Sequence, residues 1–231
     1  MSNSKPTTLD LFAAASNQRL EAEWPSPDRF PLNQDAARVE DTILADLRSS
    51  SSPLIVTGFA TLDRLIDFVA NADQCEQIRV VFGSEPFASR QDTFSIKELD
   101  LPHEMKEYWL ERGISILLSA KLLVCIERLK ANTLQTRYVA RSTWRLHAKM
   151  YVGDNAATIG SSNFTDPGLR NQLEANVRFR RNDDARKPAQ KEEHLRYLET
   201  AQVAQQFWKL GADYNAQLIE LLEQLLRLVP W

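Results

Sequence analysis

Hydrophobic positions in the first half of the chain alternate between helical spacing and short continuous runs. Apolar residues recur every three or four positions between Gln34 and Ser49, which predicts a helix. Leu54–Phe59 and Gln77–Phe82 are apolar runs typical of buried strands, and Thr61–Asn71 between them has the period of an amphipathic helix. Strand, helix and strand with short joints predict a βαβ unit, and therefore parallel strands at the centre of a sheet.

The second half of the chain is richer in strand patterns and closes with two long helices. In chain order the patterns predict a helix over 103–112, a strand over Ile114–Leu118, a helix over Leu122–Ala131, strands over Thr136–Ala140, Leu146–Val152, Ala156–Gly160 and Glu174–Phe179, and helices over Lys191–Leu210 and Asp213–Leu228. This alternation predicts an α/β fold in which helices sandwich a mixed β-sheet.

Composition along the chain divides it into three parts. Residues 1–33 include Pro25, Pro27 and Pro31 close together and predict an irregular lead-in. Residues 34–185 contain the predicted sheet, and residues 186–231 hold the two C-terminal helices, which pack on the domain or at an interface. The abrupt end at Val229–Trp231 favours a cut before a further domain.

Overall composition is that of a globular protein. Of the 231 residues, 43% are hydrophobic and 26% are charged. No apolar run approaches the ~18 residues of a membrane span, and Leu11–Ala15 is too short for a secretory signal. Cys75 and Cys125 are too few and too far apart for a disulfide framework. We therefore expect a reduced, cytoplasmic protein without a membrane partner.

The net charge of −3 conceals a basic segment. Between Arg137 and Arg181 eight basic residues stand against three acidic ones, so the rest of the chain is acidic. A local positive field in an acidic protein predicts a site for an anion. Chance clustering on solvated strands is the alternative.

The strand predicted just before residues 153–155 (Gly-Asp-Asn) carries two chemically active side chains. Because side chains alternate along a strand, His147 and Lys149 lie on the same face. The Gly-Asp-Asn sequence is a strong turn signal and predicts a hairpin. With Asp154 at the centre of the turn, Ser161 lies opposite His147, whereas a one-residue slip reverses the faces. Asp154 itself is expected to form the turn and to take no part in chemistry.

These residue types suit chemistry on a phosphodiester. A neutral imidazole is a competent nucleophile toward phosphorus and does not repel an anionic substrate as a carboxylate would. Lys149 supplies positive charge for the non-bridging oxygens. Hydrogen-bond donors for the same oxygens follow at Ser161, Ser162 and Asn163, and Gly160 lets a phosphate approach the backbone closely.

Glu174 opens the next predicted strand and is a candidate to orient the catalytic histidine. Its carboxylate would accept a hydrogen bond from the second ring nitrogen of His147. An ion pair with a nearby arginine is the alternative for Glu174. Ser162 suits a turn as well as a phosphate contact, while Tyr151 and Phe164 are expected to pack in the core.

The spacing of these residues resembles the HKD motif of the phospholipase D superfamily, H-x-K-x4-D-x5-G-S-x-N. The matched positions are His147, Lys149, Asp154, Gly160, Ser161 and Asn163. The resemblance implies a phospholipase D-like catalytic domain over residues 34–185. It also implies metal-independent phosphodiester chemistry through a covalent phosphohistidine, with no cofactor. In this chemistry one motif histidine attacks phosphorus and a second protonates the leaving oxygen.

The chain contains one H-x-K sequence, because His103 and His194 lack the lysine companion. Single-motif members of the superfamily are typically homodimers whose active site straddles the twofold axis. The resemblance therefore implies that His147 of two chains shares one site. The spacing of histidines and cysteines does not fit a zinc site, so no metal is expected.

The superfamily includes nucleases, tyrosyl-DNA phosphodiesterases and lipid enzymes, so other features must indicate the substrate. Arg141 and Arg145 are expected to bind substrate as part of a basic edge that suits a nucleic-acid backbone. The other members of this edge are Arg137, Arg178, Arg180 and Arg181. We expect a dimeric DNA endonuclease, with RNA left open, as the N-terminal module of a helicase or restriction-type protein. The alternatives are a phospholipid-processing enzyme and a non-catalytic DNA-docking and dimerisation module.

Overall fold

The computed structural model describes residues 26, 28–34, 38–83, 116–139 and 146–227. Its elements, in chain order, are α2 (Val39–Arg48), β1 (Leu54–Thr57), α3 (Leu62–Ala70), β2 (Ile78–Phe82), α5 (Ile116–Lys130), β3 (Leu134–Tyr138), β4 (Lys149–Val152), β5 (Ala156–Gly160), η1 (Pro167–Asn171), β6 (Asn176–Arg180), α6 (Pro188–Leu210), β7 (Ala212–Asp213) and α7 (Asn215–Leu226). The helix predicted over 103–112 lies outside the described residues.

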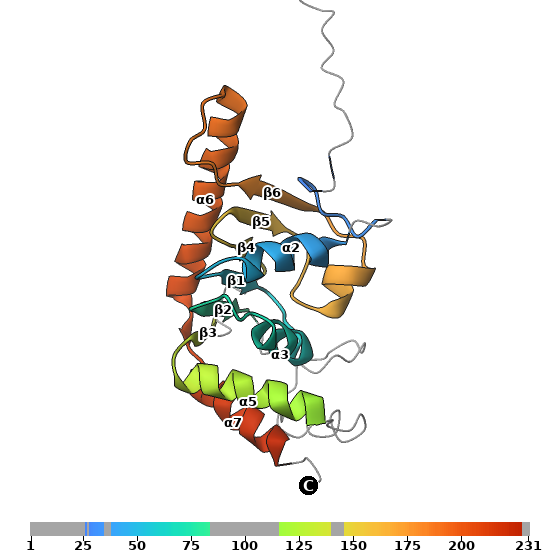
Figure 1. The fold of residues 1–231 in the computed structure, drawn as a ribbon, viewed down its shortest axis with the longest axis vertical. Helices are drawn as coiled ribbons and strands as arrows, with labels where there is room; N and C mark the ends of the chain where they lie inside the picture. Colours follow the sequence, from blue (N-terminus) through green and yellow to red (C-terminus); the bar gives the residue numbers. More distant parts are fainter. Residues whose placement is uncertain (1–25, 27, 35–37, 84–115, 140–145, 228–231) are drawn as a thin grey trace, which may run out of the picture.

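The described strands form one mixed seven-stranded sheet in the order β6-β5-β4-β1-β2-β3-β7 (Figure 1). β1, β2 and β3 run parallel, with α3 connecting β1 to β2 as the predicted βαβ unit requires. The strands β4, β5, β6 and β7 each run antiparallel to a neighbour. The predicted α/β fold with a mixed sheet is therefore confirmed.

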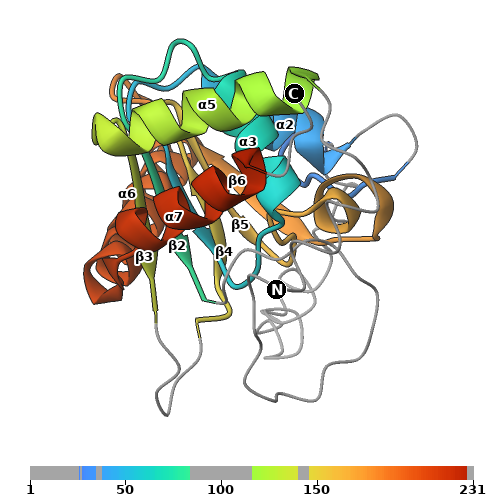
Figure 2. The ribbon, with the colours of Figure 1, turned by 90° about the horizontal axis from the view of Figure 1, so that it is seen from below.

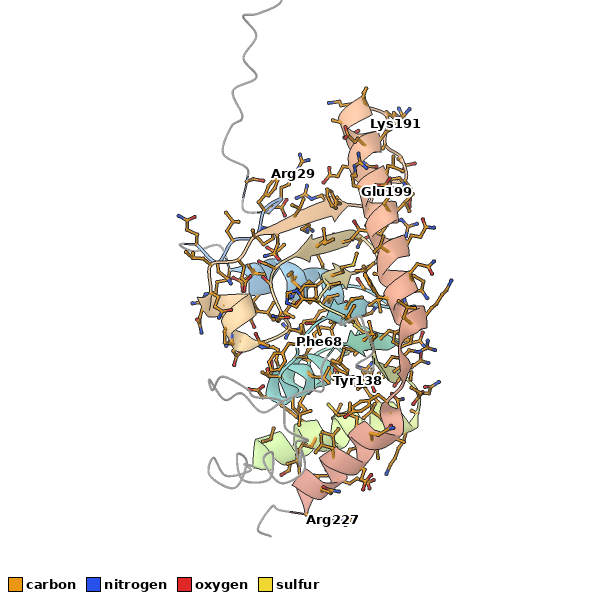
Figure 3. The ribbon with its side chains drawn as sticks, turned by 180° about the vertical axis from the view of Figure 1, so that it is seen from behind. Arg29, Phe68, Tyr138, Lys191, Glu199 and Arg227 are labelled. Atoms are coloured by element: carbon orange, nitrogen blue, oxygen red, sulfur yellow. The ribbon has the colours of Figure 1, made fainter. Side chains whose placement is uncertain are left out.

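One face of the sheet is covered by α2, α3, α5 and α7, and Figure 2 shows α5 and α7 side by side across it. Alternate strand residues such as Ile55 and Val80 point into this core. Phe68 of α3, which is labelled in Figure 3, meets Phe164 edge to face with ring centres 5.8 Å apart. Phe164 directly follows the candidate site residue Asn163, so this core also anchors the chain at the site.

The opposite face is crossed by α6, which contacts β6, β5, β4, β1 and β2. Its 23 residues make a helix about 35 Å long. Because neighbouring strands are spaced by ~4.8 Å, one such helix reaches across five of them. Leu54, Val56 and Met150 of the sheet pack against Ala204 and Trp208 of α6.

The strand predicted over Ile114–Leu118 is wrong in its described part, because residues 116–118 begin α5. The apolar run continues without a turn signal to Ile126, and a short apolar run does not distinguish a strand from a buried helix. Leu118 packs partly buried against the same core as α3 and α7, which stabilises the helical form. The helix predicted over Leu122–Ala131 is confirmed as the second part of α5.

Two short elements of the structure were not predicted. β7 pairs two residues with β3, and η1 is a single π-helical turn between β5 and β6. The other predicted elements that lie within the described residues are present, with their ends shifted by up to five residues. Among the described helices, none combines the length and the apolar character that crossing a bilayer requires.

The β4–β5 hairpin differs in register from the prediction by one residue. Gly153 N donates to Ala156 O at 2.8 Å, which closes a loop of two residues in place of a turn centred on Asp154. Ser161 therefore does not lie opposite His147, as the sequence predicted. In an antiparallel pair the position of the turn centre determines which residue of one strand lies opposite each residue of the other. A loop of a different length therefore gives a different register.

Asp154 lies in this turn, as predicted, and its expected absence from the chemistry stays a prediction. Ser51 N donates to the Asp154 carboxylate at 2.7 Å, and Asp154 N donates to Ser50 Oγ at 2.8 Å. These two bonds tie the turn to the segment that precedes β1. Both bonds are compatible with the two-residue loop and with the observed register.

Candidate active site

The candidate catalytic residues lie at the edge of the sheet where β1 and β2 end and β4 begins. His147 comes two residues before β4 and is exposed. Lys149 opens β4 opposite Thr57 of β1 and is only 4% exposed. The chain thus presents an imidazole to solvent close to a buried, fixed positive charge.

Two glycines at the ends of β1 and β2 make room for the backbone that carries His147. A Cβ on Gly58 would lie 3.1 Å from His147 Cα and from Leu146 O. A Cβ on Gly83 would lie 2.8 Å from Leu146 Cβ and would clash with Leu146 O. Glycine at these positions therefore sets how closely residues 146–147 approach the parallel strands.

Lys149 lies beneath the histidine backbone. Its Nζ donates a hydrogen bond to His147 O at 2.7 Å. Burial lowers the pKa of Lys149 below the 10.5 that is ordinary for lysine, and the negative charge of Glu174 raises it again in part. A buried ammonium group of this kind gains stability when an anion binds beside it, so the position suits a phosphate.

Ser161 and Glu174 are hydrogen-bonded to each other. The Ser161 hydroxyl donates to the Glu174 carboxylate and accepts from Ala175 N at 2.9 Å. Within the described residues no side chain hydrogen-bonds the His147 imidazole, and no arginine pairs with Glu174. The orientation of His147 by Glu174 stays a prediction, and in this structure Glu174 acts on Ser161 and, through its charge, on Lys149.

Gly160 and Ser162 both contact Asn176, a buried residue that the sequence analysis did not single out. Asn176 Nδ2 donates to Ser162 Oγ at 3.0 Å, and Ser162 N donates to Asn176 Oδ1 at 3.4 Å. A Cβ on Gly160 would lie 2.5 Å from Ala175 O. Gly160 thus has a packing role beside β6, and the Ser162 hydroxyl is engaged within the fold. Asn176 lies within the strand predicted over Glu174–Phe179, but its pairing with Gly160 is a tertiary contact that the local pattern does not contain.

Among the candidate site residues, Asn163 has a buried side-chain oxygen without a hydrogen-bond partner. Its Oδ1 atom is buried and has no hydrogen-bond partner among the described residues. An unpaired buried polar atom costs about 1–3 kcal/mol, so such atoms mark places where a ligand can bind. A half-turn of the amide presents its NH2 group instead, a donor that suits a phosphate oxygen.

The side chains of Tyr151 and Thr57 hydrogen-bond to the backbone on either side of Asn163. Tyr151 is buried, and its hydroxyl donates to Ser162 O at 2.6 Å. Thr57 Oγ1 accepts from Phe164 N at 3.2 Å. Tyr151 and Phe164 lie in the core as predicted, but these two hydrogen bonds were missed. The position of Tyr151 two residues after Lys149, on the same strand face, was the available signal.

Three described arginines of the predicted basic edge, Arg178, Arg180 and Arg181, pair with acidic side chains. Arg178 binds both oxygens of Asp46 at 2.7 Å and a third carboxylate oxygen, on Asp28, at 2.8 Å. Arg180 also pairs with Asp28. Arg181 pairs with Asp183. Asp28 and Asp46 lie more than 130 positions before these arginines, and Asp183 lies just beyond the segment that was counted, which is why a local count of charges predicted a free positive surface.

Arg137 is also engaged within the fold. Its guanidinium lies over the Trp208 ring, 4.4 Å from the ring centre, and donates to Trp208 O at 3.0 Å. Arg141 and Arg145, the arginines expected to bind substrate, lie outside the described residues. Among the described residues no group of three or more metal-ligating side chains comes together.

Comparison with known proteins gives the chain a family. Residues 47–196 match the family model described as "Cardiolipin synthase, PLD-like domain". No curated protein sequence matches the chain. The match covers the strands and loops that carry His147, Lys149 and Asn163.

Several solved structures are similar to the described fold. Nuc, a phospholipase D family member from Salmonella typhimurium, is 16% identical over 74% of this chain and 88% of its own, with a TM-score of 0.41. NucT from Helicobacter pylori is 9% identical over 76% of this chain and 90% of its own, with a TM-score of 0.42. Phosphatidylserine synthase from Haemophilus influenzae Rd KW20 is 12% identical over 98% of this chain and 54% of its own, with a TM-score of 0.47. Because the family model spans well over half of the residues, the chain belongs to the phospholipase D-like superfamily.

Proposed function

We propose that the chain is a metal-independent phosphodiesterase that cleaves DNA as a dimer through a phosphohistidine at His147. The observation that carries the proposal is the exposed His147 imidazole beside the buried, positively charged Lys149, with the unsatisfied Asn163 amide at the same edge of the sheet. Membership of the phospholipase D-like superfamily supports phosphodiester chemistry at this site. An exposed nucleophile is accessible to a bulky polymer such as a nucleic acid.

The proposed reaction has two displacements at phosphorus. A neutral ring nitrogen of His147 attacks phosphorus, and the bond from phosphorus to the leaving sugar oxygen breaks. A second, protonated imidazole gives its proton to that oxygen. Water then attacks the phosphohistidine, its proton passes to the second imidazole, and the nitrogen of His147 leaves. Lys149 stabilises the extra negative charge on the phosphoryl oxygens in both transition states.

The second imidazole is proposed to be His147 of another copy of the chain. His194 is unsuitable because its Nδ1 accepts from Asn182 N at 3.0 Å, beyond the far end of β6 from the site. His103 lies outside the described residues. A twofold axis beside His147 brings two identical imidazoles together without a second gene.

A phospholipid substrate is the second candidate, and three observations favour it. The matching family model is described by a cardiolipin synthase. Leu173, which directly precedes Glu174, is 85% exposed, and such a side chain can contact a lipid. The internal ion pairs of Arg178 and Arg180 also leave the basic edge less suited to DNA than the sequence predicted.

The experiment is DNA cleavage in excess EDTA by the purified chain and by two histidine variants. His147→Ala should abolish cleavage, whereas the matched control His194→Ala should retain it. Activity that requires Mg²⁺, or that survives His147→Ala, would refute the proposal. Turnover of phospholipid vesicles without DNA cleavage would establish the second candidate. Salt-dependent DNA binding without any cleavage would establish a docking module instead.

A further inference from the structure

Residues 28–34, which we name the N-terminal strap, lie against the edge strand β6 and the η1 turn. Arg178 N of β6 donates to Arg29 O at 2.9 Å, and Figure 3 shows Arg29 beside this strand. Asp28 accepts from Arg178 Nη1 at 2.8 Å. The sequence predicted only an irregular lead-in here, but the strap is bound to the fold by backbone and side-chain bonds.

Asn33 makes the most connections of any side chain in the strap. Its Oδ1 accepts from Val39 N at 2.8 Å, which satisfies a free amide in the first turn of α2. Its Nδ2 donates to Gly168 O at 3.1 Å and to Gln172 O at 2.9 Å, within and just beyond η1. Asn33 has a left-handed backbone with φ of 52°, which asparagine tolerates better than most residues. One amide therefore joins α2 to both ends of η1.

The η1 segment packs against the backbone of Asn163. A Cβ on Gly168 would lie 2.6 Å from Asn163 O and 2.9 Å from Asn163 N, so the two backbones are in close contact. Gly168 N donates to Thr165 Oγ1 at 3.1 Å, and Thr165 N donates to Asn163 O at 2.8 Å. A shift of η1 would therefore move the backbone of Asn163.

The strap reaches the other side of the same loop through Asn176. Asn176 Nδ2 donates to Pro31 O at 2.9 Å as well as to Ser162 Oγ. Pro31 and Asn176 are both buried, so this connection is shielded from water. The loop from Ser161 to Asn163 is thus connected to the strap on two sides, each time through one intermediate residue.

We propose that Asn33 is a positioning residue for the reaction proposed above. Its two hydrogen bonds to η1 hold the Ser161–Asn163 loop at the distance from β4 that the reaction needs. The inference rests on the proposed function, because it concerns the same site. Asn33 does not contact the substrate, and its effect passes through Gly168 and Asn163.

The test compares Asn33→Asp with Asn132→Asp. Aspartate at 33 keeps the acceptor for Val39 N and suits a helix N-terminus, but it removes both donors to η1. Asn132 is the matched control, because it also has a left-handed backbone, with φ of 59°, and lies just beyond α5, away from η1. The pair Asn33→Gly and Asn132→Gly repeats the comparison without added charge.

We expect kcat for cleavage of a DNA oligonucleotide to fall about tenfold or more in both Asn33 variants relative to their controls, with KM within about twofold. All variants are measured well below their melting temperatures, so that a loss of global stability alone leaves kcat unchanged. A kcat equal to that of the Asn132 variants, or an effect confined to KM, would overturn the inference.

Hydrogen exchange separates this inference from the proposed function. If the unaltered chain cleaves no phosphodiester, the proposed function fails and the exchange rates decide the inference. The amides of Gly168, Leu169 and Gln172 donate within or beside η1 and should then exchange faster in Asn33→Asp than in Asn132→Asp. Equal exchange rates would overturn the inference whatever the activity.

Discussion

Glu40 is the buried carboxylate that joins α2 to α3 and to η1, and replacing it with glutamine tests how the site loop is supported. Its Oε1 accepts from Arg64 at 2.7 Å and from Arg170 Nη2 at 2.9 Å, and its Oε2 accepts from Arg170 Nε. The Arg64 side chain is only 4% exposed, so its charge depends on protein partners. Glu40→Gln removes the negative charge and one acceptor while keeping the size of the side chain.

The expected loss follows from the partners that remain. Breaking a buried ion pair by removing one partner costs ~3–5 kcal/mol, because the other charge stays buried. Arg64 keeps a second carboxylate partner, Asp166, and the glutamine keeps one oxygen acceptor. We therefore expect the free energy of unfolding to fall by about 2–3 kcal/mol, roughly 30- to 150-fold in the unfolding equilibrium.

The assay is equilibrium unfolding in urea, with Glu223→Gln as the control. Glu223 is likewise a glutamate in an ion pair, with Lys130 at 2.7 Å, but the Glu223 side chain is 38% exposed. The control should show no measurable loss, since exposed pairs contribute little. Equal urea midpoints for Glu40→Gln and Glu223→Gln would refute the reasoning that burial makes the ion pairs of Glu40 contribute more to stability than an exposed pair.

The same comparison has a pH dependence. Burial raises the pKa of Glu40, but hydrogen bonds and charges from Arg170 and Arg64 outweigh it and hold this pKa below the ordinary 4.5. Because the pKa is lowered in the folded state, the stabilisation is present above the unfolded value and is lost as pH falls through the folded value. The difference between the unaltered chain and Glu40→Gln should therefore narrow in acid, and a difference that widens would contradict this account.

Two further predictions concern the site itself. Lys149 must stay protonated to stabilise the phosphoryl oxygens. Glu174→Gln removes the negative charge that raises the pKa of Lys149 and should lower this pKa further, which an NMR titration of the Lys149 side chain measures. A pKa of Lys149 that is unchanged or raised in Glu174→Gln would contradict this. Gly83→Ala places a methyl group against Leu146 and should lower both the melting temperature and kcat, because the backbone leading to His147 must shift. Unchanged melting and kcat would show that the close approach at Gly83 has no role.

Much of the fold could be predicted because its strands have strong local patterns. The parallel centre follows from two apolar runs that flank an amphipathic helix, and β5 was predicted with the bounds that the structure has. Residues 116–118 were misassigned because the apolar residues of this segment suit a strand and a buried helix equally. Packing of Leu118 against the core that includes α3 and α7 stabilises the helix, and the local sequence gives no information about this packing.

The site was predictable in its residue types but less so in its geometry. The turn of the hairpin is held by a hydrogen bond from Ser51 N to the Asp154 carboxylate and by one from Asp154 N to Ser50 Oγ, between residues about one hundred positions apart in sequence. The pairing of Arg178 with Asp28 and Asp46 is likewise long-range, and no local charge count can show it. Asn33 was missed for the same reason, since its partners in η1 lie more than 130 positions later.

The most direct test of the central claim is to trap the covalent intermediate. A DNA oligonucleotide with a labelled phosphate is mixed with the chain, quenched under alkaline denaturing conditions during turnover, and the labelled residue is located by mass spectrometry. The account predicts a phosphoryl adduct on His147 that is absent in His147→Ala. Cleavage with no adduct, or with the label on another residue such as Ser161, would contradict it.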